Sequence, residues 1–180
     1  MLDVGLLLGA LAFAAEKHTA QRRKDAERSP YINHPIVVAH LLWNVGGVRD
    51  TTILIAGILH DTVEDTDTTP AEIEERFGAA VRAVVEEVTD DKSLAKATRK
   101  QLQVDRAAHK SEAARHVKLA DKISNLRDMH DSPPADWSLE RKREYVAWAC
   151  AVVDQMRGTN AGLEAEFDAV HAACVKTFGA

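Results

Sequence analysis

Apolar residues recur at helical spacing along most of the chain, and few segments alternate apolar and polar positions over the length of a strand. Strong breaks occur at Ser29-Pro30, Gly46-Gly47 and Ser132-Pro133-Pro134. Between these breaks the pattern predicts helices over approximately residues 3–17, 35–46, 50–61, 70–77, 79–88, 94–107, 112–130, 138–157 and 160–177. The sequence therefore predicts an all-α bundle that forms a single domain over residues 1–180.

One apolar segment ends in an unusual group of ionisable side chains. The run Ile53–Leu59 is followed at once by His60 and Asp61, and then by Glu64 and Asp65. Polar residues at a helix end can simply cap unpaired backbone carbonyl groups. That interpretation accounts for one pair of residues taken alone, but two other segments carry similar polar insertions.

The second insertion is His34, which precedes Pro35. A proline disfavours α geometry at the residue before it, so His34 is expected at the entrance of a helix. The third is Asp121, in the middle of a predicted helix, where aspartate is unfavourable. Lys118, Asp121 and Asn125 share one helix face at spacing i, i+3 and i+7. An ordinary solvated face with a local ion pair is the alternative for this segment.

Two imidazoles and two carboxylates on three helices could form a mixed nitrogen and oxygen metal site, made of His34, His60, Asp61 and Asp121. The set has no thiolate, so it does not indicate a closed structural zinc site. It suits a divalent ion such as Mn²⁺ or Fe²⁺. A bound metal lowers the pKa of its water, and the two following acids are placed to take the proton.

Composition narrows the class of partner. Apolar residues make up 46% of the chain, as in an ordinary folded protein. The formal net charge is -5, and this negative charge argues against general binding of DNA or RNA. Local basic stretches at 22–24 and 92–100 could still bind phosphates, although each could also be a solvated face. The apolar run 6–15 is too short to span a bilayer and is expected to be the first core helix. Two distant cysteines fit a reducing cytoplasm.

Five blocks in this order extend the pattern of histidines and aspartates: Arg22-Arg23-Lys24-Asp25, Tyr31-Ile32-Asn33-His34-Pro35, Leu59-His60-Asp61-Thr62-Val63-Glu64-Asp65-Thr66, Val88-Thr89-Asp90-Asp91-Lys92 and Lys118-Leu119-Ala120-Asp121-Lys122. Together they resemble the HD superfamily of metal-dependent phosphohydrolases. The resemblance is greatest to the hydrolase domain of the RelA/SpoT proteins and to the stand-alone small alarmone hydrolases. It covers about residues 8–160 and implies an HD-type helical bundle with a metal site at its centre.

The resemblance also implies roles for particular residues. His34, His60, Asp61 and Asp121 would be ligands of one Mn²⁺, with Fe²⁺ and Zn²⁺ as alternatives, and Glu64 and Asp65 would activate and place the attacking water. Substrate contacts are implied for Arg23, Lys24, Asn125, Arg141 and Tyr145, and the basic stretch adds Lys96. The implied reaction removes pyrophosphate from the 3′ position of ppGpp or pppGpp and leaves GDP or GTP.

Two other functions remain open at this stage, because one fold supports many reactions. The same site could act on another nucleotide with a 2′- or 3′-phosphate, for example NADPH. Alternatively, the domain could bind a nucleotide without turnover. A purely structural helical protein explains none of the three polar insertions. The sequence does not give the oligomeric state, for which a dimer is the candidate.

Overall fold

The computed structural model describes residues 2–179, and within these residues every regular element is a helix. An isolated bridge between Arg22 and Pro30 joins extended backbone in the loop between the first two helices. The helices are α1 (Val4–Lys17), α2 (Asn33–Asn44), α3 (Thr51–Leu59), α4 (Thr62–Asp65), α5 (Pro70–Phe77), α6 (Ala79–Val88), α7 (Lys96–Ala107), α8 (Glu112–Asp131), α9 (Leu139–Asp154) and α10 (Ala161–Phe178). The predicted all-α class is confirmed.

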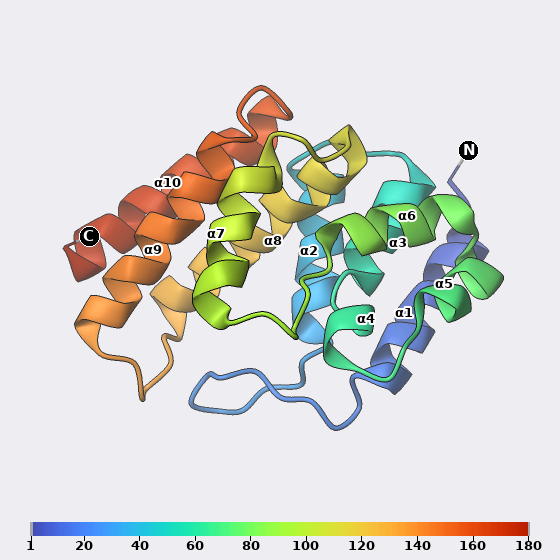
Figure 1. Cartoon of the computed structure of the whole chain (residues 1–180), viewed down its shortest axis with the longest axis horizontal. Coiled ribbons are helices and arrows are strands. Elements are labelled where there is room, and N and C mark those ends of the chain that lie inside the picture. The colour runs from blue at the N-terminus through green and yellow to red at the C-terminus, as the bar shows by residue number, and fades with distance from the viewer. Residues whose placement is uncertain (1, 180) are drawn as a thin grey trace.

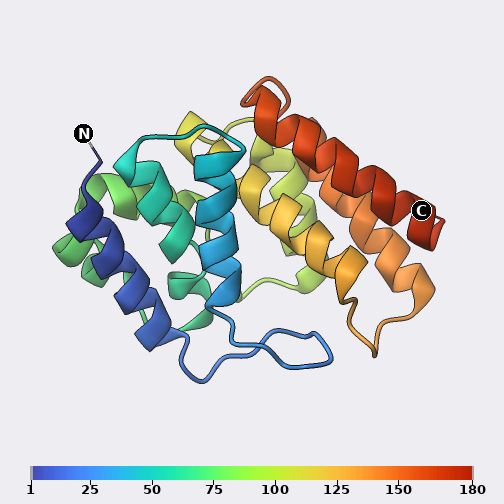
Figure 2. The ribbon, with the colours of Figure 1, turned by 180° about the vertical axis from the view of Figure 1, so that it is seen from behind.

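Helix α8 lies at the centre of the bundle and contacts α2, α3, α6, α9 and α10. Figure 1 shows α1, α3, α5 and α6 gathered at one end, and α9 and α10 at the other. Figure 2 shows α8 from behind, between α2 and the last two helices. Because α8 is enclosed on several sides, its polar residues 116, 118, 121, 122 and 124 are buried beside its apolar ones. The fold thus encloses the face that carries Asp121.

The start of α2 differs from the sequence prediction. The helix begins at Asn33, two residues before Pro35, so His34 lies inside its first turn. The backbone N–H of Asn33 donates to the carbonyl of Pro30, and that of His34 donates to Tyr31. A tight turn therefore leads into the helix, and Pro35 needs no hydrogen-bond partner because first-turn N–H groups have none within the helix.

The end of α3 also differs from the prediction. We expected a helix to about residue 61, but α3 ends at Leu59 and the separate short helix α4 follows. His60 and Asp61 occupy the tight turn between the two helices. Both residues of the turn keep right-handed helical dihedral angles, and Glu64 and Asp65 of α4 line the same cavity as Asp61.

Two other expectations are confirmed. The Thr69 hydroxyl accepts a hydrogen bond from the Glu72 N–H at 3.2 Å, as the capping spacing predicts. The apolar run near the N-terminus is helix α1, and Ala10, Phe13 and Ala14 are buried in the core. Among residues 2–179 the structure has no helix that is long and apolar enough to cross a membrane.

Candidate metal centre and adjoining cavity

The two histidines and two aspartates predicted from the sequence meet at one point. The Nε2 atoms of His34 and His60 are 3.3 Å apart. Asp61 Oδ2 lies 3.6 Å from the first of these nitrogens and 3.0 Å from the second. Asp121 Oδ1 lies 3.3 Å and 3.8 Å from the same two atoms. His34, His60 and Asp121 therefore offer donor atoms that all lie within 4.8 Å of one another, and Asp61 contacts both imidazoles of this group.

Hydrogen bonds on the far side of each ring orient the imidazoles. His60 Nδ1 lies 2.9 Å from the carbonyl oxygen of Gly57. A carbonyl only accepts, so Nδ1 carries the proton and Nε2 of the neutral ring has a free lone pair. His34 Nδ1 lies 2.9 Å from the Ser124 hydroxyl, which supports the same tautomer. Such outer partners are typical of histidines that bind metals.

The donor set fits a divalent ion. Ligand atoms about 2.1 Å from an ion, at right angles or tetrahedral positions, are roughly 3.0–3.4 Å apart. The contacts of 3.0–3.8 Å between the imidazole nitrogens and the carboxylate oxygens come close to this spacing. Neutral imidazole and carboxylate are suitable ligands for several divalent metals. The cluster therefore has the donors and the spacing to hold one.

Without an ion, the charges of the cluster are strongly coupled. Burial lowers the pKa of His34, so this ring is neutral. Burial also opposes charge on His60, but Asp61 and Asp121 outweigh it and raise the pKa of His60 to about 10. Although burial disfavours the ionised form of Asp121, Lys122 and the histidines hold the pKa of this carboxyl well below its ordinary value. The cluster is thus poised to exchange a proton for a cation.

Asp61 is held by a residue that the sequence reasoning had not assigned a role. The Tyr31 hydroxyl donates to Asp61 Oδ2 at 2.5 Å. Burial raises the pKa of Tyr31 far above its ordinary value, so the phenol keeps its proton. Tyr31 therefore fixes one carboxylate oxygen of the cluster. The signal in the sequence was only its position three residues before His34.

The two acids of α4 lie beside this cluster in different surroundings. Glu64 Oε2 accepts the Asp90 N–H at 3.0 Å, and Glu64 Oε1 is 4.0 Å from Arg99 Nη1. Burial raises the pKa of Glu64, and Asp90 and Asp61 raise it further. Asp65 is fixed by Gln21, which donates at 2.8 Å, and by an ion pair with Lys92. Glu64 is the acid whose environment favours accepting a proton.

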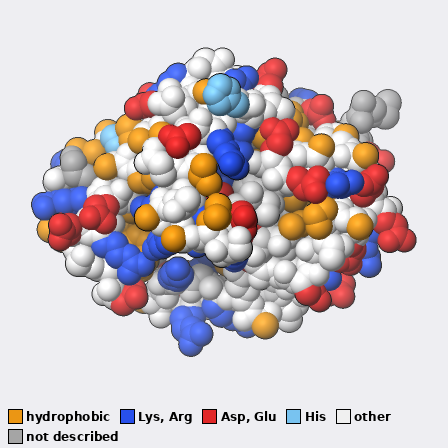
Figure 3. Space-filling model, viewed as in Figure 1, with side chains coloured by type: hydrophobic (Ala, Val, Ile, Leu, Met, Phe, Trp, Pro, Cys, Tyr) orange, Lys and Arg blue, Asp and Glu red, His pale blue; other side chains and the backbone are white. Residues whose placement is uncertain are grey.

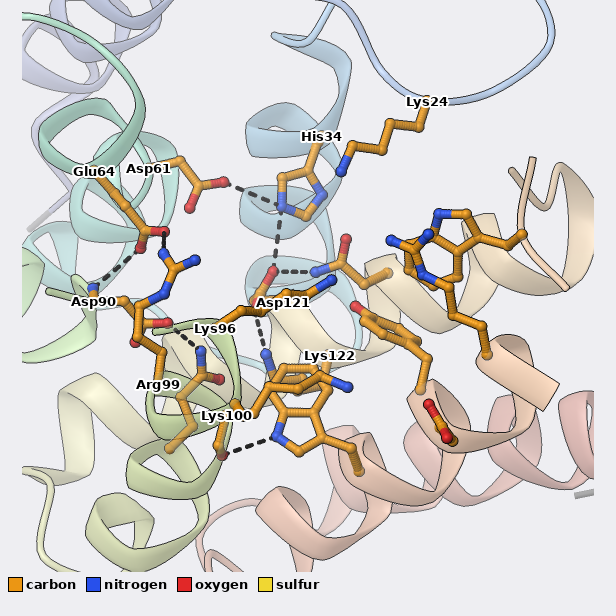
Figure 4. Close-up of a pocket in the computed structure, with 18 of the residues that line it drawn as sticks. Lys24, His34, Asp61, Glu64, Asp90, Lys96, Arg99, Lys100, Asp121 and Lys122 are labelled. Atoms are coloured by element: carbon orange, nitrogen blue, oxygen red, sulfur yellow. Dashed lines mark hydrogen bonds and ion pairs between the residues drawn. The ribbon is translucent and has the colours of Figure 1, made fainter. Parts of the chain in front are cut away.

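A cavity of about 790 Å³ opens beside the cluster and is large enough for a nucleotide. Figure 4 shows Glu64, Asp61, His34 and Asp121 along one side of it. Ten of the twelve predicted site residues line this cavity, and His60 and Arg23 do not: the ten are Lys24, His34, Asp61, Glu64, Asp65, Lys96, Asp121, Asn125, Arg141 and Tyr145. His60 is buried behind this surface.

Basic and aromatic side chains form the opposite wall. The Arg141 guanidinium lies 4.1 Å from the centroid of the Trp137 ring, and Lys100 Nζ lies 4.7 Å from that of Trp148. Tyr145 packs against both tryptophans. In Figure 3, Lys and Arg side chains gather at the lower left of this face, where the surface is hollowed. A cationic and aromatic wall of this kind suits a phosphorylated base.

Arg23 lies in a second, smaller hollow of about 290 Å³ that adjoins the first and shares Lys24 and Asn125 with it. Its guanidinium pairs with Asp128 and donates to Asn125 Oδ1 at 3.3 Å. Asn125 in turn donates to Asp121 Oδ1 at 2.5 Å. The structure thus links the basic loop to the metal cluster through one amide side chain.

Several residues that face the cavity were missed as site residues. They come from α7, α8 and α9 and from the loops that precede these helices: Asp90, Arg99, Lys100, Gln103, Lys118, Lys122, Trp137 and Trp148. The basic stretch at 92–100 was a signal, because Lys96 and Lys100 share one helix face at spacing i, i+4. Nothing local in the sequence distinguishes Trp137 and Trp148 from core residues.

Comparison with known proteins identifies the family to which this helical fold belongs. A family model described as HD domain matches residues 10–149. The chain belongs to the HD domain family.

Within that family the chain is 56% identical over 166 residues to guanosine-3′,5′-bis(diphosphate) 3′-pyrophosphohydrolase MESH1 of Xenopus tropicalis, which covers 92% of this chain and 93% of that protein. The protein of the same name from Homo sapiens is 57% identical over 162 residues, 90% of each chain. A solved structure, described as a metazoan ortholog of SpoT that hydrolyzes ppGpp and plays a role in starvation responses, superposes with a TM-score of 0.92. It is 45% identical and covers 96% of this chain and 97% of its own.

Proposed function

We propose that the chain is a metal-dependent guanosine-3′,5′-bis(diphosphate) 3′-pyrophosphohydrolase, which converts ppGpp or pppGpp to GDP or GTP and pyrophosphate. The observation that carries this assignment is the identity of 56% to a protein of that name over 92% of the chain. The cluster of imidazoles and carboxylates beside a cavity of about 790 Å³ agrees with it.

The proposed metal ligands are His34, His60, Asp61 and Asp121, and the proposed ion is Mn²⁺, with Fe²⁺ and Zn²⁺ as alternatives. Support comes from the mixed donors and from the contacts of 3.0–3.8 Å between the two nitrogens and the carboxylate oxygens. A divalent ion bound there would lower the pKa of water and neutralise charge on the phosphate oxygens.

Glu64 is the proposed general base, since burial and two neighbouring acids raise its pKa toward that of a useful proton acceptor. Glu64 Oε1 takes a proton from water while Oε2 stays fixed by the Asp90 N–H. The water oxygen forms a bond to the phosphorus attached to O3′, the bond from phosphorus to O3′ breaks, and O3′ receives a proton. Asp65, held by Gln21 and Lys92, orients the water.

The nucleoside end is proposed to lie where the two hollows meet. Asn125, which lines both, would face the ribose. Arg23 and Lys24 would lie against the guanine base, because a guanidinium can stack on a base as well as pair with phosphate. Lys96, Arg141 and Tyr145 line the outer wall and would contact the 5′-phosphates or the base. These contacts orient the substrate so that only the 3′ phosphorus reaches Glu64.

The proposed setting is the cytoplasm, supported by two free cysteine thiols in the described part of the chain. The substrate is a guanine nucleotide and not DNA or RNA, since a net charge of -5 opposes binding to a polyanion.

The experiment removes the metal, adds back Mn²⁺, and follows ppGpp by chromatography beside Glu64→Ala and Asp121→Ala variants. We expect Mn²⁺-dependent release of GDP and pyrophosphate, and loss of release in both variants. A metal-loaded protein that leaves ppGpp intact would contradict the proposal. Nucleotides with a single 2′- or 3′-phosphate, NADPH among them, would then be assayed in the same way.

A further inference from the structure

Lys118 is a buried lysine that faces the cavity. Its side chain lies on α8, is only 7% exposed as a residue, and lines the cavity beside the metal cluster. Among the described residues, the nearby acids Asp121, Asp90 and Asp61 act on its amine only through their charge, and no hydrogen bond or ion pair holds it. A buried charge without a partner is unfavourable by several kcal/mol in general, so such groups are normally paired.

The neighbouring lysine on the same helix shows the contrast. Lys122 is also buried, but its amine is 3.1 Å from Asp121 Oδ2 and 4.4 Å from the centroid of the Trp148 ring. Lys122 is therefore satisfied by the protein itself. Lys118, one turn earlier, has an amine available for an anion that enters the cavity.

Residues along the middle of helix α8 line the cavity. Lys118, Asp121 and Asn125 all line it, and seven residues of helix separate the first from the last by about 10 Å. Asn125 contacts Arg23 at the nucleoside end, Asp121 belongs to the metal cluster, and Lys118 marks the opposite end. A phosphorus atom at the cluster would therefore have its nucleoside on one side and any further phosphate on the side of Lys118.

Other unsatisfied polar atoms gather at that inner end. Arg99 on α7 faces Glu64 at 4.0 Å, and its buried Nε has no partner among the described residues. Gln103, one turn further along α7, also has a buried and unpaired Oε1. Both side chains line the same cavity. Lys118 also lowers the pKa of Glu64, so the amine of Lys118 and the guanidinium of Arg99 both lie beside that acid.

We propose that Lys118, with Arg99 of the same cavity, binds the terminal phosphate of the 3′-pyrophosphate and so selects a pyrophosphoryl group over a single phosphoryl group. This inference rests on the proposed function and deepens it. Lys118 is a specificity-determining residue here. Burial lowers the pKa of Lys118, and a bound phosphate would restore its charge.

The test compares ppGpp with guanosine 5′-diphosphate 3′-monophosphate, which differs from it by one phosphate. For wild type, Lys118→Met and Lys118→Arg we would measure the ratio of the two kcat/KM values. We expect the methionine variant to lower the preference for ppGpp at least tenfold, and the arginine variant to restore part of it. Lys100→Met, at the basic wall, is the matched control and should lower both values together.

The outcomes separate the two proposals. Turnover of ppGpp by the wild type tests the proposed function, whereas the ratio in Lys118→Met tests the inference. An unchanged ratio in a folded Lys118→Met variant, judged by its thermal melting, would overturn the inference and leave the hydrolase assignment standing.

A binding measurement covers the case in which Lys118→Met does not fold or the wild type does not turn over. Pyrophosphate and inorganic phosphate would each be titrated into the Mn²⁺-loaded wild type. We expect pyrophosphate to bind at least tenfold more tightly than phosphate, with a smaller preference in Lys118→Arg. Equal affinity for the two anions in the wild type would overturn the inference.

Discussion

The Nε2 atoms of His34 and His60 face each other at 3.3 Å, and both lie within 3.6 Å of Asp61 Oδ2. The far side of each ring is fixed by Ser124 or by the Gly57 carbonyl, so neither ring can turn away without losing a buried hydrogen bond. The fold therefore holds the donors together before any ion arrives, which is the arrangement expected of a preorganised metal site.

Removal of the metal is predicted to lower thermal stability. A ligand that binds only the folded state stabilises it by about 2.7 kcal/mol when present at 100 times its dissociation constant. For a domain of this size that corresponds to a rise in melting temperature of roughly 5–10 °C. Melting curves of chelator-treated protein, with and without added Mn²⁺, measure the difference.

Two variants show whether the effect belongs to the cluster. Asp121→Ala removes a donor atom 3.3 Å from His34 Nε2, so its melting temperature should not respond to Mn²⁺. His130→Ala changes a histidine whose side chain is 38% exposed, away from the cluster, and should respond as the wild type does. An equal Mn²⁺ response in both variants would show that the ion binds elsewhere.

Glu64→Gln is predicted to lower kcat by at least about 10²-fold while metal binding is retained, because general bases contribute roughly 10²–10⁴ in rate. The amide keeps the size of the side chain and can still accept the Asp90 N–H, but it cannot take a proton. Single-turnover assays with ppGpp and a metal titration give the two quantities. Glu75→Gln, on the exposed face of α5, is the control and should keep the kcat of the wild type. A normal kcat in Glu64→Gln would show that Glu64 is not the general base.

Asp90→Asn is predicted to shift the acid limb of the pH–rate profile toward lower pH. Glu64 acts as a base only when ionised, so activity falls as the pH drops through its pKa. The negative charge of Asp90 helps to raise that pKa, and its removal therefore extends activity into more acidic solution. The backbone N–H to Glu64 persists, and asparagine can still accept from Gln103 Nε2, which lies 2.6 Å from Asp90 Oδ2.

The measurement is kcat/KM for ppGpp across pH 4–8 for wild type and variant, a range that brackets the ordinary pKa of glutamate, about 4.3. An acid limb that moves upward in Asp90→Asn, or does not move, would contradict Glu64 as the titrating base.

Much of the fold and of the metal cluster could be predicted from the sequence, because helical periodicity and misplaced polar residues are local signals. His60, Asp61 and Asp121 interrupt apolar stretches, and this is visible without any knowledge of tertiary contacts. The starts of α2 and α4 could not be predicted, since a tight turn stabilised by backbone bonds of residues 30–34 has no strong signature beside Pro35.

The cavity wall could be predicted least. Lys100 and Trp148 meet across α7 and α9, 48 residues apart, where the indole Nε1 donates to the Lys100 carbonyl at 3.0 Å. Neither residue carries a local pattern that distinguishes a cavity wall from a core or a solvated face. Lys118 likewise has the sequence pattern of an ordinary helix lysine, and only the packed structure shows that it is buried. Such features depend on long-range packing, which one sequence does not display.

Gly162→Ala is predicted to destabilise the fold by about 1–3 kcal/mol, the usual effect of overpacking a close contact. A methyl group there would lie 2.4 Å from the carbonyl oxygen of Val45, and backbone cannot yield as a flexible side chain does. The start of α10 is already fixed against this segment, because Asn160 Nδ2 donates to the Gly46 carbonyl at 2.8 Å. Gly9→Ala in α1, where the added methyl meets nothing within 4 Å, should instead stabilise by about 0.5–1 kcal/mol. Urea unfolding of both variants measures the change in the free energy of unfolding. If Gly162→Ala also stabilised the fold, the contact between Gly162 and the Val45 carbonyl would not be as close as described.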